Sequence, residues 1–209
     1  MSLSDDLLSG LSALGVVLDS AQQKKLLNYI ALIVKWNKVY NLTAVREPEA
    51  MIGHHLLDSL AVLPHLTGVQ RLIDVGSGAG LPGIPLAIAR PDMQIALLDS
   101  NHKKTTFMRQ ACLELGLTNA EVVCERVENW QPQDKYDTVI SRAYSELKEF
   151  VRLSAHLVAK GGKLYAMKGL YPTEEITQLK AGAKVEAVMP LTVPGLEAQR
   201  HLVIIGVEE

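Results

Sequence analysis

A glycine-rich segment that begins at Asp74 is the part of the sequence best suited to bind a cofactor. Glycines follow at Gly76, Gly78, Gly80 and Gly83, after a short apolar stretch and before a helix-forming one. Glycine lets the backbone turn sharply and approach a ligand without a Cβ in the way. A helix that begins there adds unpaired N–H donors and the positive end of its dipole. The spacing therefore predicts a cofactor site at this turn.

Asp99 is the second candidate, nineteen residues after Gly80 and at the end of the next predicted strand. In a doubly wound sheet this position lies beside the glycine turn, where a carboxylate can accept hydrogen bonds from both ribose hydroxyls. A turn that serves packing alone is the weaker interpretation.

Two cofactors fit this arrangement. The spacing Gly78-x-Gly80-x-x-Gly83 satisfies the dinucleotide fingerprint and indicates NAD. Taken from Asp74, the pattern Asp-x-Gly-x-Gly-x-Gly is that of class I methyltransferases. In those enzymes the loop binds the amino-acid part of S-adenosylmethionine and the acid binds its ammonium group. Three features favour S-adenosylmethionine, with S-adenosylhomocysteine as product. They are the presence of Asp74, a reversed strand expected at the end of the sheet, and the lack of a predicted second domain.

The first of the elements that must position these residues is a helical extension, residues 1–66. Leucines recur there at helical spacing, and a capping-box signal at Ser20 and Gln23 opens the second helix. Pro48 suits the first turn of a third helix, which is expected to run to about Leu63.

From Arg71 on, short apolar strands alternate with helices, which indicates a parallel, doubly wound α/β sheet with helices on both faces. The strands are expected at Arg71–Val75, Ile95–Leu98, Glu121–Cys124, Asp137–Ile140 and Lys163–Met167, and the helices at Pro82–Ala89, Lys103–Leu115, Leu147–Val158 and Thr173–Leu179. Only a loop joins the last two strands, Val185–Met189 and His201–Val207, so they form an antiparallel pair. We expect a seven-stranded, mostly parallel, Rossmann-like sheet of the class I methyltransferase type, with a reversed C-terminal strand. It occupies a domain of residues 67–209.

Composition and charge restrict the functional class. Hydrophobic residues make up 48% and charged residues 21%, as in an ordinary soluble globule. The net charge of −2 excludes a basic coat for nucleic acid over the whole surface but allows a local basic patch. The N-terminus is acidic where a secretory signal would be basic, so a cytoplasmic protein without membrane contact is expected. Cys112 and Cys124 lack metal-ligand spacing, so no metal site is expected.

Eight motifs run in order along nearly the whole chain. They are Trp36-Asn37-Lys38 with Asn41-Leu42-Thr43, His55-Leu56-Leu57-Asp58-Ser59, Asp74–Pro85, Leu97-Leu98-Asp99-Ser100, Arg126-Val127-Glu128, Ile140-Ser141-Arg142-Ala143, Lys168-Gly169 and Arg200-His201-Leu202-Val203. In these motifs the chain resembles the bacterial small-subunit rRNA guanine-N7 methyltransferases, the RsmG (GidB) family.

The resemblance implies methylation of N7 of guanine 527, in the 530 loop of 16S rRNA. The implied partner is 16S rRNA, either naked or within a 30S particle, and no obligate protein partner is indicated. The resemblance also implies cofactor contacts at Gly76, Leu81, Val127, Glu128 and Arg142.

Guanine N7 has a lone pair and no proton, so its methylation needs no general base. A cytosine-C5 enzyme needs a nucleophilic cysteine, and an exocyclic-amine enzyme usually carries Asn/Asp-Pro-Pro-Tyr/Phe after the fourth strand. Here that position reads Ser141-Arg142-Ala143-Tyr144, and Cys124 is interpreted as structural. Positioning is then most of the catalytic task.

Arg142 is the candidate catalytic residue, because it is expected at the carboxyl end of the fourth strand, where doubly wound sheets hold ligands. Its guanidinium could donate to the guanine O6 or stack on the base. An ion pair with a nearby carboxylate is the alternative. Lys168, at the end of the fifth strand, is expected to contact a phosphate or the base. A solvated lysine is the alternative. His55 and Asp58 share a helical face, and a structural hydrogen bond is favoured over a ligand role.

Several basic residues are candidates for an RNA-facing rim. They are Arg126, Arg200, His201, Lys103, Lys104 and Arg109. Lys103 and Lys104 begin a helix, where exposed lysines are common. RNA contact and simple solvation are therefore equally favoured for this pair. Two other functions remain open: a methyltransferase for a small molecule, with the N-terminal helices as a lid, and a non-enzymatic RNA-binding protein with a vestigial fold.

Overall fold

A seven-stranded sheet forms the centre of the computed structural model, which describes residues 2–142, 146–179 and 182–207. The strands are β1 (Arg71–Val75), β2 (Gln94–Leu98), β3 (Ala120–Val123), β4 (Tyr136–Arg142), β5 (Val158–Lys168), β6 (Ala183–Pro190) and β7 (His201–Val207). Their order is β3-β2-β1-β4-β5-β7-β6, and every neighbouring pair is parallel except the two that contain β7. The predicted α/β sheet with one reversed C-terminal strand is therefore confirmed.

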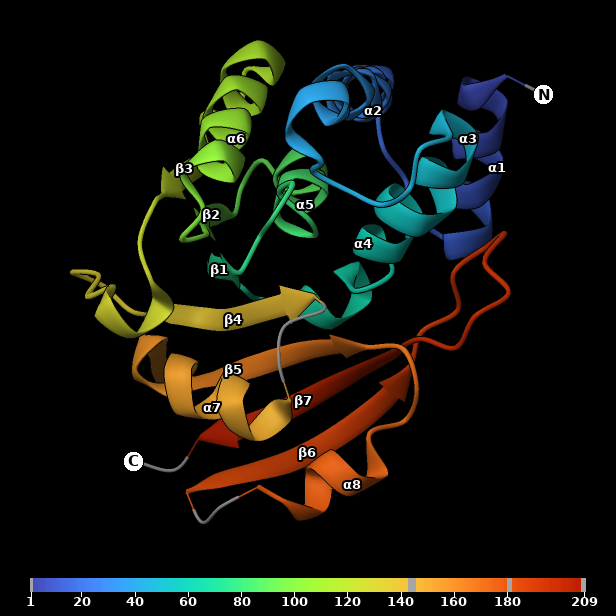
Figure 1. Ribbon diagram of the computed structural model, residues 1–209. Helices are drawn as coiled ribbons and strands as arrows, with labels where there is room; N and C mark the ends of the chain where they lie inside the picture. The colour runs from blue at the N-terminus through green and yellow to red at the C-terminus, as the bar shows by residue number, and fades with distance from the viewer. Residues whose placement is uncertain (1, 143–145, 180–181, 208–209) are drawn as a thin grey trace.

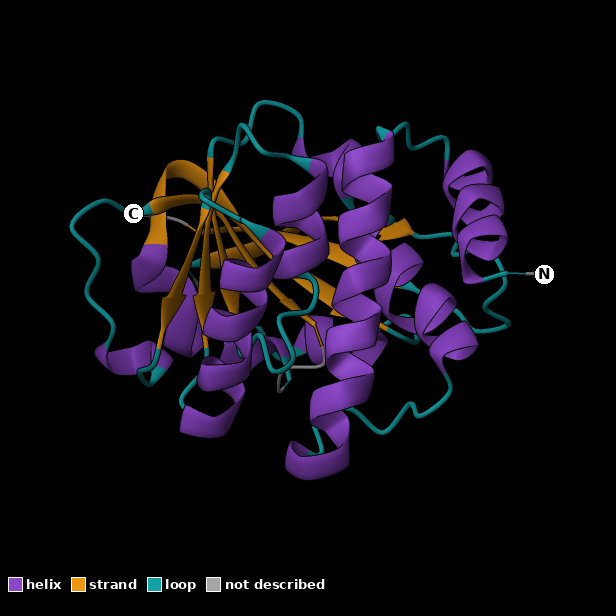
Figure 2. Cartoon of the chain, turned by 90° about the horizontal axis from the view of Figure 1, so that it is seen from above, coloured by secondary structure: helices purple, strands orange, loops and turns teal. Residues whose placement is uncertain are grey.

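Helices cover both faces of this sheet (Figure 1). They are α1 (Leu3–Leu14), α2 (Ser20–Tyr40), α3 (Pro48–Met51), α4 (Asp58–Leu60), α5 (Gly83–Ala89), α6 (His102–Leu115), α7 (Leu147–Ser154) and α8 (Thr173–Thr177). The N-terminal helices, α5 and α6 lie on one side of the sheet, and α7 and α8 lie on the other. Seen from above the first of these layers, the strands form a twisted fan beneath the helices (Figure 2).

The N-cap of α2 differs from the prediction by one residue. Asp19, not Ser20, caps the helix. The Gln22 N–H donates to Asp19 Oδ1 at 2.7 Å, and the Asp19 N–H donates to Gln22 Oε1 at 2.9 Å, so the reciprocal box begins one residue earlier. Asp and Ser are comparable N-caps, which is why spacing alone did not distinguish them.

The third predicted helix, from Pro48 to about Leu63, is not one regular helix. Pro48 begins α3 as expected, but a π-helical turn, Ile52–Leu57, separates α3 from α4. A π turn replaces the usual i→i+4 hydrogen bonds with i→i+5 bonds, and such turns occur frequently at functional sites. His54 and His55 lie in this turn.

The start of β5 also differs from the prediction. Val158, expected in a helix, begins this strand, which the sequence placed from Lys163 on. Gly161 and Gly162 lie between the two positions, and glycine weakens the strand pattern on which the prediction relied.

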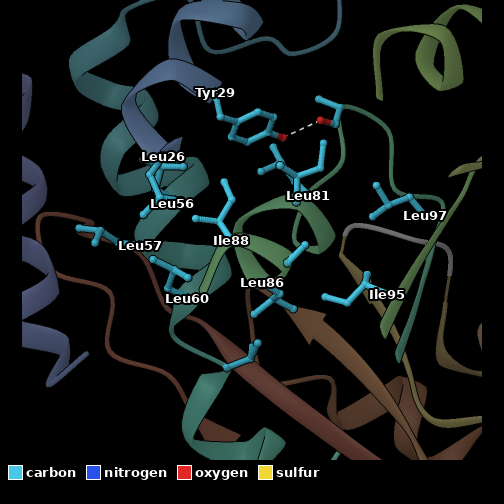
Figure 3. Packing of buried hydrophobic residues seen from close by; sticks show 14 of the residues in the cluster. Leu26, Tyr29, Leu56, Leu57, Leu60, Leu81, Leu86, Ile88, Ile95 and Leu97 are labelled. Carbon is cyan, nitrogen blue, oxygen red and sulfur yellow. Dashed lines mark hydrogen bonds between the residues drawn. The ribbon is translucent and has the colours of Figure 1, made fainter. Parts of the chain in front are cut away.

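Alternation along the strands divides the core between the two faces of the sheet. Ile73 and Val75 belong to the cluster on the α7 side, and Leu72 belongs to the cluster under the N-terminal helices, α5 and α6. Tyr29 of α2 and Leu86 of α5 both belong to this second cluster (Figure 3). The N-terminal helices and the sheet thus share one hydrophobic core. In the part of the chain that the structure describes, no helix is both long and apolar enough to cross a membrane.

Candidate functional site

The glycine segment forms the turn between β1 and α5. Gly76, Gly78 and Gly80 have φ values of 70°, 60° and 87°, a region that other residues rarely adopt. Gly83 is required for another reason, because a Cβ there would overlap a β2 side chain and lie 2.9 Å from Asp74 Oδ2. The start of α5 therefore packs closely against the sheet.

Asp74 lies under this turn with no exposed surface. Its Oδ2 accepts the backbone N–H of Gly83 at 2.8 Å, and its Oδ1 has no hydrogen-bond partner among the described residues. Burial raises the pKa of this carboxyl to about 7, although the Gly83 N–H partly offsets the effect. The side chain that the sequence assigned to an ammonium group thus exposes no atom, and it holds the start of α5 in place.

Asp99 follows β2 and faces a cavity of about 540 Å³. Its Oδ2 accepts the N–H of Gly78 at 2.9 Å, and its Oδ1 accepts the N–H of Asn101 at 2.8 Å. The ammonium of Lys104 lies 3.9 Å from Oδ2. Each carboxylate oxygen can accept a further hydrogen bond. The glycine turn therefore fixes the orientation of a carboxylate that can still bind a diol.

This first cavity brings together four of the nine residues that the sequence assigned to a cofactor. Its lining includes Gly76, Asp99, Val127 and Glu128, and also Lys104 and Arg126, which were expected to face RNA. Gly78 is linked to the cavity by its hydrogen bond to Asp99. Gly80 and the buried Leu81 lie deeper in the turn. Its volume lies within the range of about 300–1,000 Å³ that is usual for small-molecule sites. The cavity can hold a nucleoside.

A second cavity, of about 370 Å³, lies at the ends of β4 and β5. Its lining includes Arg142, Lys168, Arg200, His54, His55 and Asp58. The two cavities lie at neighbouring strands, because β1 pairs with β4, and Ser141, the residue before Arg142, donates from its Oγ to the carbonyl of Val75 in the first cavity at 2.7 Å. The structure therefore brings the candidate catalytic residues next to the candidate cofactor site but not into it.

Arg142 is held at the second cavity by two hydrogen bonds. Its Nη1 donates to Asp58 Oδ2 at 3.0 Å and to the carbonyl of His54 at 2.8 Å. The ion pair with a carboxylate, which the sequence left as the alternative role, is thus present. Because the side chain remains 20% exposed and lines the cavity, this pair orients the guanidinium without closing it off.

Lys168 is bound to α8. Its Nζ donates to both carboxylate oxygens of Glu175, at 3.1 and 2.8 Å. Glu175 also accepts the backbone N–H of Leu147 at 2.7 Å, so its carboxylate links α8 to the start of α7 as well as to Lys168. At 16% side-chain exposure, Lys168 is a shielded charge in the cavity wall rather than a solvated lysine.

Among the described residues, His55 and Asp58 make structural hydrogen bonds, but not with each other. His55 Nε2 lies 2.9 Å from Thr43 Oγ1, and its Nδ1 has no described partner. Both Asp58 oxygens accept from arginines, Arg142 and Arg200. Burial, followed by the charge of Arg142, lowers the pKa of His55 to about 4. The imidazole is therefore neutral near pH 7.

The remaining basic candidates separate by position. Arg200 belongs to the second cavity, and His201 follows it, with Nδ1 at 2.9 Å from the Gly169 carbonyl. Lys103 is exposed at the start of α6, and Arg109 is exposed further along that helix. Neither Lys103 nor Arg109 lines either cavity.

Ala143 and Tyr144, which the sequence compared with other methyltransferase signatures, lie outside the described residues. The comparison of signatures therefore stays a sequence-based argument.

Tyr29 is a contributor that sequence reasoning missed. Its hydroxyl donates to the carbonyl of Ala79, in the glycine turn, at 2.6 Å (Figure 3). Burial raises the pKa of Tyr29 well above its usual value, so the hydroxyl stays protonated. No sequence pattern points to this contact, because the two residues are fifty positions apart.

The family model GidB, described as rRNA small subunit methyltransferase G, matches residues 22–203. The chain is 59% identical over 198 residues to the ribosomal RNA small subunit methyltransferase G of Chromobacterium violaceum, with 95% of each chain covered. It is 57% identical over 206 residues to the protein of the same name from Laribacter hongkongensis, with 99% of each covered.

Solved structures show the same fold at low identity. The glycopeptide N-methyltransferase MtfA complexed with S-adenosylhomocysteine superposes with a TM-score of 0.63 and 10% identity, over 74% of this chain and 88% of that one. The ribosomal protein L11 methylase of Lactobacillus delbrueckii gives 0.56 and 14%, over 73% and 77%. The expected class I methyltransferase fold is thereby confirmed.

Proposed function

The chain belongs to the GidB family, rRNA small subunit methyltransferase G, and on that basis we propose that it methylates N7 of guanine 527 in the 530 loop of 16S rRNA, with S-adenosylmethionine as the donor. We place the reaction in the cytoplasm, with 16S rRNA or a 30S particle as the partner. The observation that carries the proposal is the pair of neighbouring cavities, one built around Asp99 and one around Arg142.

The first cavity suits the donor. Asp99 would accept the ribose hydroxyls, Gly76 would let the amino-acid part approach the backbone, and Val127 and Glu128 would hold the adenine. S-adenosylmethionine would supply a methyl group activated by its sulfonium. Asp74 supports this site from beneath, since it fixes the Gly83 N–H at the start of α5 rather than touching the ligand.

The second cavity suits an acceptor that needs no general base. Both oxygens of Asp58 already accept hydrogen bonds from arginines, and the lowered pKa of His55 makes its imidazole a weak base. Guanine N7 needs no proton removed, so these groups are compatible with its methylation. The Arg142 guanidinium would donate to the guanine O6 and leave N7 facing the donor. Lys168 would form part of the wall of this cavity, with its charge balanced by Glu175.

The proposal is tested with 30S particles and 16S rRNA from cells that lack this protein. Each is incubated with the enzyme and S-adenosylmethionine, cleaved with borohydride and aniline, and analysed by primer extension. N7-methylguanine is scissile under this treatment, so a new stop at guanine 527 is expected in at least one substrate. Methyl incorporation without that stop would assign another atom, and transfer only to a small molecule would refute an rRNA substrate.

A further inference from the structure

Asp58 joins three segments that are distant in sequence. It is 2% exposed and lies at the start of α4, in the helical extension. Its Oδ2 accepts from Nη1 of Arg142, at the end of β4, and its Oδ1 accepts from Nε of Arg200, just before β7, at 3.0 and 2.9 Å. One buried carboxylate therefore sets the position of two guanidiniums that line the second cavity.

The charges around this carboxylate do not cancel. Glu175 balances the charge of Lys168, and His55 is neutral, so Arg142 and Arg200 face Asp58 with one positive charge in excess. Each guanidinium has five N–H donors. The described contacts engage Nη1 of Arg142 and Nε and Nη1 of Arg200, so donors remain on both forks for a ligand rich in acceptors.

Stability alone is a weak reason for such a cluster. Taking charges out of water is costly, and apolar residues of similar volume often replace buried ion pairs without loss of stability. The partial exposure of the two arginines, 20% and 23%, points instead to a role at the cavity.

We propose that Asp58 is a positioning residue for the acceptor base, because it holds Arg142 and Arg200 as a fixed pair of donors. This inference rests on the proposed function. It assigns the helical extension a direct part in building the acceptor site, and it adds Arg200 to Arg142 as a residue that contacts the acceptor.

A double-mutant cycle tests this role. Asp58→Asn, Arg200→Met and the double variant are compared with the natural protein for kcat and KM on 30S particles and for S-adenosylmethionine affinity. Ser59→Ala is the matched control, because Ser59 is equally buried on the same helix and its hydroxyl donates to the backbone carbonyl of His55, whereas Asp58 accepts from the two arginines. Thermal unfolding shows whether each variant is folded.

Each single variant is expected to lower kcat/KM for RNA by about tenfold or more, while the affinity for S-adenosylmethionine stays within about twofold. The kcat/KM of the double variant should be close to that of the less active single variant. Ser59→Ala should have the kcat/KM of the natural protein. Should Asp58→Asn fail to fold, Arg200→Lys carries the test, because lysine keeps the charge but lacks the Nε donor. It should show the same loss.

Three results would overturn the inference. The first is an Asp58→Asn variant, or Arg200→Lys in its place, with the kcat/KM of the natural protein. The second is a double variant in which the two losses multiply. The third is a donor affinity that falls as much as RNA turnover. A natural protein that transfers no methyl group to RNA overturns the proposed function itself, and this inference with it.

Discussion

The backbone N–H of Gly78 donates a 2.9 Å hydrogen bond to Oδ2 of Asp99, which joins the turn after β1 to the carboxylate after β2. The two parts of the predicted cofactor site are therefore one unit. The positive φ of Gly78 aims its N–H at the carboxylate, and the carboxylate in turn holds the turn in its bent form. A change at either residue should affect both the shape of the turn and the binding of a nucleoside.

Asp99→Ala should weaken S-adenosylmethionine binding by about tenfold or more, because hydrogen bonds to a charged group contribute about 1.5–3 kcal/mol. Equilibrium dialysis with labelled S-adenosylmethionine measures the change. Asp99→Asn keeps one carbonyl oxygen and should lie between the alanine variant and the natural protein. Equal affinity in all three proteins would remove Asp99 from the site.

Arg142→Ala should reduce methyl transfer to 30S particles by about a hundredfold or more, a loss typical of a donor that acts on the reacting group. The fold should survive, because Asp58 keeps Arg200 as a partner. Single-turnover assays measure the rate. Lys24→Ala is the control, since Lys24 is exposed on α2 outside both cavities and should leave the rate unchanged. Normal turnover in Arg142→Ala contradicts the assignment.

The raised pKa of Asp74 predicts a pH dependence of stability. A carboxyl whose pKa is about 7 when folded, and near its ordinary value when unfolded, stabilises the fold fully below about pH 4. That contribution is lost as the pH rises through about 7. The natural protein should therefore lose unfolding free energy relative to Asp74→Asn across this window. The expected difference is on the order of a few kcal/mol, since each pKa unit corresponds to about 1.4 kcal/mol.

Urea unfolding at several pH values from 4 to 8 measures this difference. Asp92→Asn is the control, because Asp92 is an exposed carboxyl whose pKa is lowered by its hydrogen bond with Arg90. Asp92→Asn should therefore show the same loss of unfolding free energy with rising pH as the natural protein. A constant gap between the natural protein and Asp74→Asn at every pH speaks against a raised pKa at Asp74.

Tyr29→Phe should cost about 1–3 kcal/mol of unfolding free energy, because the carbonyl of Ala79 loses its hydrogen bond in a buried place. It should also weaken S-adenosylmethionine binding, since Ala79 lies in the glycine turn. Tyr165→Phe is a matched control, because that hydroxyl donates to the carbonyl of His65, away from the turn. Both variants should be less stable, and only Tyr29→Phe should lose affinity; equal donor affinity in the two contradicts the role of Tyr29.

The sequence predicted the parts of the site that depend on short spacings. The glycine pattern and Asp99 could be placed because the order of β1, α5 and β2 determines where their ends meet. The sequence also predicted the reversed β7, because only a loop joins the last two strands and a parallel crossover would normally need a helix.

The contacts that complete the site could not be predicted in the same way. The hydrogen bonds from Tyr29 to Ala79 and from Arg200 to Asp58 join residues that meet only after the helices pack on the sheet. The burial of Asp74, which leaves its carboxylate without exposed surface, likewise depends on the whole core. Local pattern gives residue types and element ends, whereas side-chain partners follow from tertiary packing.

Isothermal titration of the natural protein with S-adenosylmethionine, S-adenosylhomocysteine and NAD tests most directly the claim that the Asp99 cavity binds a methyl donor. Saturable binding of the first two ligands at one site per chain is predicted, with no heat from NAD. Binding of NAD alone, or of none of the three, would contradict the account.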